Sequence, residues 1–155
     1  MCSSDLSRAC RARRRGWRGP VLNAAFHWPV RVYWEDTDAG GVVYHASYLR
    51  FLERARTEWL RALGIGQMAF KDATGLAFLV REMRLDFLRA ALLDDELTVT
   101  VAVKERRAAS ILFGQTIARA DGACLLRAEV RVACVDTRRM RAVAIPADLI
   151  PEPAP

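Results

Sequence analysis

The sequence predicts an α+β fold in which one long amphipathic helix packs against one face of a five-stranded antiparallel sheet. A strand-like run of β-branched and aromatic residues at 30–34 comes first. A helical pattern then extends from about His45 to Leu63, with apolar residues three or four positions apart. Beyond Gly64 and Gly66 the apolar period changes from about 3.6 to 2, which indicates a meander of strands.

The first strand and the helix each end at residues that disfavour regular structure. The acidic and glycine-containing stretch from Asp36 to Gly41 breaks the strand and predicts a loop. Glu53 and Arg56, three residues apart, are expected on the solvent-exposed face of the helix, and Gly64 is expected to end it. The apolar stripe is bulky enough to require cover from the sheet or from a second subunit. It consists of Tyr48, Leu52, Ala55, Trp59 and Leu63.

Four extended runs are expected to complete the sheet, at about 76–88, 97–103, 111–119 and 124–134. In the last run, the even-numbered residues from Cys124 to Cys134 are apolar and form one face, whereas Arg127 and Arg131 lie on the other. Asp121-Gly122 predicts a tight hairpin before it, because both residues tolerate positive φ. The strands on either side are therefore expected to be antiparallel neighbours.

Composition and charge fit one soluble globular domain of 155 residues, 52% of them apolar. No stretch reaches the roughly 18 uninterrupted apolar residues of a membrane-spanning helix. The net charge of +6 is concentrated in residues 1–25, where six arginines and one aspartate leave +5, so that residues 26–155 carry only +1. A nearly neutral domain argues against a nucleic-acid-binding face.

The predicted organisation is a basic, disordered tail at 1–25, a single domain at 26–150, and a loose proline-containing tail at 151–155. The first tail lacks the apolar region of a secretory signal, so a cytoplasmic location is expected. Its arginine-rich composition also resembles an organelle transit peptide, and an upstream extension without structural value is an equal alternative.

Titratable side chains concentrate between the first strand and the helix, where Glu35, Asp36, Asp38, Tyr44 and His45 fall within eleven residues. A carboxylate beside the free N–H groups of a helix start can act as acid, base or nucleophile, and those N–H groups can stabilise an oxyanion. Aspartate also commonly caps turns, and composition alone favours that structural role for both aspartates. No cysteine or histidine spacing suggests a metal site.

The order of residues in this region carries a family resemblance. Residues 33–49, YWEDTDAGGVVYHASYL, and residues 51–60, FLERARTEWL, closely resemble the tol-pal system-associated acyl-CoA thioesterases, in the 4-hydroxybenzoyl-CoA thioesterase-like branch of the hotdog superfamily. The resemblance extends from about Pro29 to Pro146 and is strongest over Val32 to Gly64. It implies a hotdog fold, in which an antiparallel sheet wraps the long helix, and dimers that join two sheets edge to edge and usually pair into homotetramers.

The resemblance also implies which residues are catalytic. Asp38, the second aspartate of an Asp-x-Asp motif, would act on the thioester carbonyl as nucleophile or as base for water, and the backbone N–H of His45 would polarise that carbonyl. The His45 side chain matches a residue implicated in catalysis in relatives, with helix capping or substrate contact as nearly equal alternatives. Trp34 stands where relatives often carry tyrosine, so no hydroxyl role is transferred to it.

The implied substrate is acyl-CoA, hydrolysed without a cofactor. Contacts to it are expected from residues near the catalytic pair and from cations that could bind the CoA phosphates, although a solvated hairpin also explains the cations. These candidates are Gly41, Val42, Tyr44, Tyr48, Lys104, Arg106 and Arg107. Ser47 is discounted as a nucleophile, because residues two apart on a helix point to different faces. Glu53 is a possible second acid, although an ion pair with Arg56 or Arg50 is favoured.

Two other functions stay open at this point. A hotdog dehydratase shares the fold, but it usually carries its histidine ahead of the helix and a glutamate within it, in a Pro/Gly-rich setting that is absent here. A non-catalytic module that binds acyl-CoA or an acyl carrier protein at the inner membrane is the second alternative.

Overall fold

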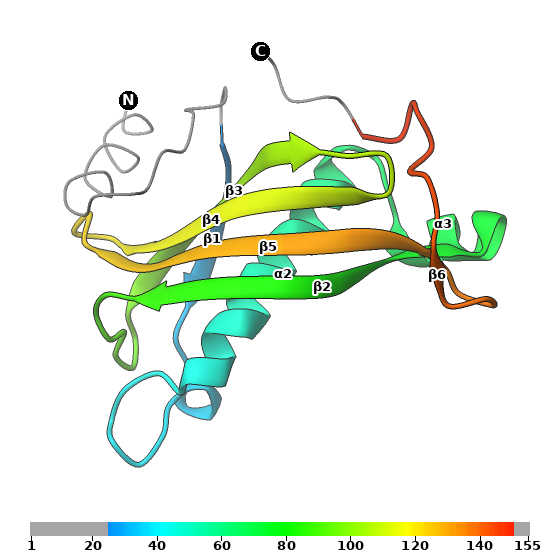
Figure 1. Ribbon diagram of the computed structural model, residues 1–155. Coiled ribbons are helices and arrows are strands. Elements are labelled where there is room, and N and C mark those ends of the chain that lie inside the picture. The colour runs from blue at the N-terminus through cyan, green and yellow to red at the C-terminus, as the bar shows by residue number, and fades with distance from the viewer. Residues whose placement is uncertain (1–24, 151–155) are drawn as a thin grey trace.

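The computed structural model describes residues 25–150, and its elements form one antiparallel sheet with a long helix crossing one face (Figure 1). In chain order these elements are β1 (Phe26–Arg31), the 3-10 turn η1 (Trp34–Asp36), α2 (His45–Ala62), α3 (Gln67–Thr74), β2 (Leu76–Phe87), β3 (Glu96–Arg106), β4 (Ser110–Arg119), β5 (Cys124–Asp136) and β6 (Arg141–Ala142). Residues 1–24 of the predicted tail at 1–25, and the whole of the predicted tail at 151–155, lie outside the described residues.

The strand order in the sheet is β1-β3-β4-β5-β2, and every pairing is antiparallel. The two-residue strand β6 pairs with the end of β5 and adds a short sixth strand to the five that were predicted. β1 and β2 form the two edges of the main sheet. The curved sheet and the helix that it wraps confirm the expected hotdog arrangement (Figure 1).

The core lies between α2 and the concave face of the sheet. Phe51, Leu52 and Ala55 of α2 are fully buried there. From the sheet, Val99 and Ile117 are equally buried, and they sit opposite each other in the β3–β4 register. On β5 the even-numbered residues from 124 to 134 are all buried, as predicted, but Leu125 and Arg127 are buried too, so burial alternates only between residues 128 and 134. Burial of side chains this large contributes roughly 1.5–3 kcal/mol each, which is why the helix is held in place.

The predicted helix is confirmed to within one residue at its C-terminal end. Gly64 adopts a φ of +80°, a conformation that only glycine takes without cost. Its N–H donates to the carbonyl of Arg61, and the N–H of Ile65 donates to the carbonyl of Leu60. These bonds satisfy carbonyls that the end of the helix leaves without intrahelical partners.

The first strand is earlier than predicted. It pairs with β3 from Phe26 to Arg31, so Trp34 falls in the 3-10 turn rather than in the sheet. The cause is local, because the N–H of Tyr33 donates to Oδ2 of Asp36 at 3.0 Å and turns the chain away from β3. A strand preference in residues 32–34 is thus overridden by a turn that the following aspartate and Thr37 support.

Helix α3 was not predicted from the sequence. None of its side chains is fully buried, so it lacks the apolar period that marks a core helix. Phe70 anchors it by stacking on Phe78 of β2, with ring centroids 5.8 Å apart. Gly75, with a φ of +72°, ends it in the left-handed conformation.

The hairpin between β4 and β5 confirms that these strands are neighbours, but the turn differs in detail. Gly122 has a φ of +84°, whereas Asp121 does not have a positive φ. The N–H of Arg119 donates to the carbonyl of Ala123, which closes a loop of three residues rather than two.

Within residues 25–150, neither helix combines the length and the apolar character needed to cross a membrane.

Candidate active site

The loop before α2 is closed on itself by backbone hydrogen bonds. Thr37 and Val43 form an isolated antiparallel bridge, and the N–H of Asp38 donates to the carbonyl of Val42 at 3.0 Å. The N–H of Tyr44 donates to the carbonyl of Asp36 at 2.8 Å. Asp38 is therefore held across the loop from Val42, and Val42 lies three residues before the helix begins.

The Asp38 carboxylate is exposed in the single chain, and its orientation is set from within the loop. The N–H of Gly40 donates to Oδ1 of Asp38 at 2.7 Å. A Cβ on Gly40 would lie only 3.0 Å from that oxygen, so the close approach depends on glycine at this position. The second carboxylate oxygen has no partner among the described residues and is open for chemistry.

The N-terminus of α2 adjoins this loop and is not capped by a side chain. Tyr44 occupies the N-cap position and makes no side-chain capping bond, and the first turn contains no acidic residue. The first N–H groups of a helix have no intrahelical partner, so those of His45 and Ala46 can donate to an added oxygen atom, whereas the N–H of Ser47 already donates to the carbonyl of Tyr44 at 2.8 Å. The His45 ring is exposed and packs against the Tyr44 ring, with centroids 4.3 Å apart.

Two of the other polar side chains near the loop, those of Asp36 and Ser47, are buried, whereas Glu35 is exposed. Asp36 is almost fully buried and accepts from the N–H of Tyr33, which agrees with the turn-capping role expected for it. Ser47 is completely buried whereas His45 is exposed, so the two side chains do lie on different faces of the helix. Among the aspartates of this loop, only Asp38 presents its carboxylate to the outside.

The remaining candidates near the loop divide into exposed and buried groups. Gly41 and Tyr44 are exposed, and Val42 is half-buried. Tyr48, expected to contact substrate, is a core residue whose hydroxyl accepts from the N–H of Ala91 at 2.9 Å. Burial raises its pKa above the usual value for tyrosine. The carbonyl of Ala91 accepts from the N–H of Val43, so this residue joins the helix to the loop.

The three candidate cations lie far from this loop within one chain. Lys104 is eight residues, or roughly 26 Å, along β3 from Glu96 at the strand's other end. Its ammonium lies 2.6 Å from Oε1 of Glu129. Arg107 pairs with Glu105 at 2.8 Å, and Arg106 donates to the carbonyls of residues 146 and 147. Within one chain these cations therefore do not join Asp38 and His45.

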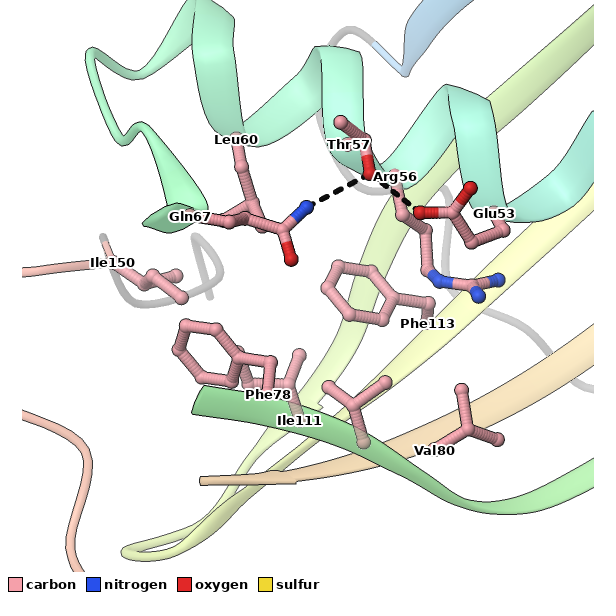
Figure 2. A pocket seen from close by; sticks show the side chains of 11 residues that line it. Glu53, Arg56, Thr57, Leu60, Gln67, Phe78, Val80, Ile111, Phe113 and Ile150 are labelled. Atoms are coloured by element: carbon pink, nitrogen blue, oxygen red, sulfur yellow. Dashed lines mark hydrogen bonds between the residues drawn. The ribbon is translucent and has the colours of Figure 1, made fainter. Parts of the chain in front are cut away.

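A cavity that sequence reasoning missed lies farther along the helix. It has a volume of about 80 Å³ and is lined by α2, the start of α3 and the concave face of the sheet (Figure 2). Neither Asp38 nor His45 lines it. Arg56, which was expected on the solvent-exposed face of the helix, is instead buried beside the cavity and donates to Gln115 at 2.8 Å. The side chain of Glu53 accepts from Thr57, not from an arginine.

Residues 25–150 contain no group of three or more His, Cys, Asp or Glu side chains placed to hold a metal ion.

Comparisons with known proteins bear on this geometry. The family model of the thioesterase-like superfamily matches residues 32–151. The acyl-CoA thioesterase YbgC of Haemophilus influenzae is 50% identical over 129 residues, covering 83% of this chain and 94% of its own length. The acyl-CoA thioester hydrolase YbgC of Escherichia coli O157:H7 is 48% identical over 127 residues, covering 82% and 94%.

Solved structures share the fold. A probable thioesterase from Bartonella henselae superposes with a TM-score of 0.75 at 33% identity, covering 79% of this chain and all of its own. A mutant of 4-hydroxybenzoyl-CoA thioesterase complexed with 4-hydroxybenzoyl-CoA gives a TM-score of 0.75 at 23% identity, over 81% and 95% of the chains, which supports the fold alone. With the family match and the relatives near 50% identity, this chain belongs to the thioesterase-like superfamily.

Proposed function

We propose that this chain is an acyl-CoA thioesterase that hydrolyses the thioester to a free acid and CoA, with Asp38 as the catalytic carboxylate. One observation carries the proposal: the closed loop holds an outward-facing carboxylate beside a helix start that no side chain caps. The relatives named acyl-CoA thioesterases, which cover four fifths of the chain, support the substrate class.

Asp38 can act in either of two ways. As a nucleophile, its free oxygen adds to the thioester carbonyl, the C–S bond breaks, CoA leaves as a thiolate, and a mixed anhydride remains for water to hydrolyse. As a base, it takes a proton from a water molecule whose oxygen bonds to the carbonyl carbon as the thiolate leaves. In both cases a thiolate is a good leaving group, so a lone carboxylate is sufficient and the thiolate takes up the released proton.

The start of α2 supplies the second part of the mechanism. When the carbonyl carbon becomes tetrahedral, its oxygen acquires negative charge. The N–H of His45, together with the positive end of the helix dipole, is placed to stabilise that charge. A single well-placed donor of this kind contributes about two to three powers of ten in rate.

A second copy of the chain is proposed to complete the site. β2 is an edge strand that exposes Leu79 and Phe87, and an exposed apolar edge commonly pairs with another strand. Antiparallel pairing of β2 with its own copy gives a two-fold dimer that joins two sheets. The start of α2, into which the preceding loop leads, is tied to this edge, because Tyr48 packs against Phe87 with centroids 5.6 Å apart. In Figure 1 the same loop extends beyond β2.

The decisive experiment compares the wild type with Asp38→Asn. An asparagine carbonyl can still accept from the N–H of Gly40, so the loop is retained while the carboxylate chemistry is removed. Acyl-CoA hydrolysis should fall by about 10² or more, with an unchanged circular dichroism spectrum. A matched control is Asp136→Asn, which changes the same side chain in a turn at the far end of β5.

The outcomes separate the alternatives. Unchanged hydrolysis by Asp38→Asn removes Asp38 from the mechanism. A protein that binds acyl-CoA but turns it over in neither form is a binding module. Single-turnover hydrolysis in oxygen-18 water distinguishes the two roles of Asp38, because label enters its carboxylate only if an anhydride forms.

A further inference from the structure

The cavity beside α2 has an apolar interior and a polar rim. Ile111, Phe113 and Ile150, which line it, are almost fully buried. At the rim, Nε2 of Gln67 donates to Thr57 at 2.8 Å, and the Thr57 hydroxyl donates to Glu53 at 2.7 Å. This chain of hydrogen bonds joins α3 to α2 along one side of the cavity (Figure 2). The buried guanidinium of Arg56 also lines the cavity, but it donates to Gln115, and the remaining interior side chains are apolar, so this part of the space accepts hydrocarbon.

The cavity is aligned with the proposed site along the same helix. Glu53 lies eight residues, or about 12 Å, from His45, and Leu60 lies fifteen residues, or about 22 Å, from it. In Figure 2, Glu53 and Val80 mark one end of the cavity, whereas Leu60 and Ile150 mark the other. The Glu53 end therefore faces Asp38 and the Ile150 end is distal.

An apolar strip on β2 connects the catalytic loop with the cavity. Phe87, Leu85 and Met83 alternate along the helix-facing side of the strand, opposite core residues of β5, and each is only partly covered. Phe87 contacts Tyr48 near the start of α2. The strip continues into Val80, which is 49% exposed and lines the cavity. Partly exposed apolar side chains therefore extend from the catalytic loop to the cavity.

The distal end is closed by the C-terminal segment. Ile150 is 1% exposed, and the segment that carries it is fixed by backbone bonds, from Val143 to Cys134 at 2.9 Å and from Ile145 to Ala108 at 2.7 Å. Ile145 is also buried but does not line the cavity. The two isoleucines thus share a segment and a degree of burial, and differ in whether they face the cavity.

We propose that this cavity binds the methyl end of a long acyl chain and that Ile150 sets the upper limit of chain length. The inference rests on the proposed thioesterase function and deepens it by naming the substrate class. An extended alkyl chain advances about 1.25 Å per C–C bond, so an acyl chain needs about ten carbons to reach the cavity and about eighteen to reach its distal end. Straight-chain acyl groups in this range are the ligands that fit.

The test measures binding of S-alkyl-CoA thioethers, which lack the carbonyl and cannot be hydrolysed, with chains of four to eighteen carbons. Once the tail reaches the cavity, each added carbon should tighten binding about fourfold, which corresponds to about 0.8 kcal/mol per buried CH2. The gain should stop at a limiting length. Ile150→Ala should move that limit about two carbons longer, because it removes a side chain two bonds long beyond Cβ, and Ile150→Phe should move it shorter.

Ile145→Ala is the matched control, since it removes an equal volume from the same segment outside the cavity. The proposal is overturned if affinity does not rise with chain length, or if Ile145→Ala moves the limit as far as Ile150→Ala does. These readouts are independent of turnover. A protein that shows the chain-length limit but hydrolyses no acyl-CoA would retain the cavity assignment and lose the thioesterase function. A protein that hydrolyses acyl-CoA but shows no chain-length limit in binding would retain the thioesterase function and lose the cavity assignment.

Discussion

Arg56 of α2 donates from Nη1 to Oε1 of Gln115 on β4 at 2.8 Å, inside the core between helix and sheet. The two residues are 8% and 1% exposed. Nε2 of Gln115 donates in turn to the carbonyl of Leu52 at 3.1 Å. Burial removes the Arg56 guanidinium from water and lowers its pKa, and the negative charge of nearby Glu53 offsets only part of this effect. This polar pair fixes how the helix lies across the sheet.

Breaking that pair from one side should destabilise the fold. Arg56→Met keeps much of the aliphatic stem but leaves the Gln115 carbonyl buried without a donor, and we expect a loss of about 1.5–3 kcal/mol in urea unfolding. Arg56→Met combined with Gln115→Leu should recover much of this loss, because no polar group is then left unsatisfied. Arg54→Met, on the exposed face of the same helix, is the control. Additive effects of the two substitutions would contradict the coupling.

Tyr48→Phe tests the junction between the helix and the catalytic loop. It removes the acceptor for the buried N–H of Ala91, so the free energy of unfolding should fall by about 1–3 kcal/mol. Hydrogen exchange at the amides of Ala91 and Val43 should accelerate, because Ala91 bonds to Tyr48 through its N–H and to Val43 through its carbonyl. Tyr33→Phe, at an exposed tyrosine, should change neither quantity. Unaltered exchange at Val43 would show that the loop does not depend on this contact.

Gly40→Ala tests whether the orientation of the Asp38 carboxylate matters. The new Cβ would lie 3.0 Å from Oδ1, so the carboxylate must move. We expect kcat to fall about tenfold or more, since small displacements of reacting groups are costly, with little change in unfolding because the position is exposed. Gly66→Ala, whose Cβ would make an ordinary 3.8 Å contact, is the control. Wild-type kcat in Gly40→Ala would refute the requirement.

Asp136 should make stability depend on pH. Its carboxylate accepts from the N–H groups of Arg139 and Arg138, and these bonds hold its pKa below the usual value of 3.8. Its contribution is therefore present above that value and is lost as the pH falls through the lower pKa of the folded protein. Urea unfolding of the wild type and Asp136→Ala should differ at pH 6 and converge in stronger acid. Asp136→Asn can accept the same bonds but does not titrate, so its stability should not show this pH dependence. A stability difference between the wild type and Asp136→Ala that persists in strong acid would contradict the prediction.

Leu79→Lys tests the proposed pairing of β2 edges. Leu79 is 42% exposed on the edge strand, and a lysine there opposes pairing with another strand. Light scattering should show at least a dimer for the wild type and a shift toward monomer in the variant, with lower hydrolysis. Leu92→Lys places the same charge at a residue that is 47% exposed in a loop, and it should leave the assembly intact. A monomeric and fully active wild type would contradict the pairing.

Local patterns were sufficient to predict most elements of the fold. The stripe of α2, the glycine that ends it and the alternation on β5 each depend on neighbours within a few residues, so they can be seen in the sequence. Helix α3 could not be predicted this way, because its anchors are tertiary: Phe70 stacks on Phe78 of a later strand and Gln67 donates to Thr57 of α2. The 3-10 turn at Trp34 escaped prediction for a similar reason, since it depends on the side chain of Asp36.

For the candidate site, the sequence by itself determined which residues stand together: the Asp38 loop and the start of α2 are contiguous, so their proximity required no tertiary contact. The tertiary structure alone decided what lies beside them. It separated Lys104 from the loop along a strand, buried Tyr48 against Ala91, and paired Arg56 with Gln115. It also brought Ile150 to a cavity between α2 and the sheet. Contacts of this kind join residues far apart in the chain, and no local period records which of them will meet.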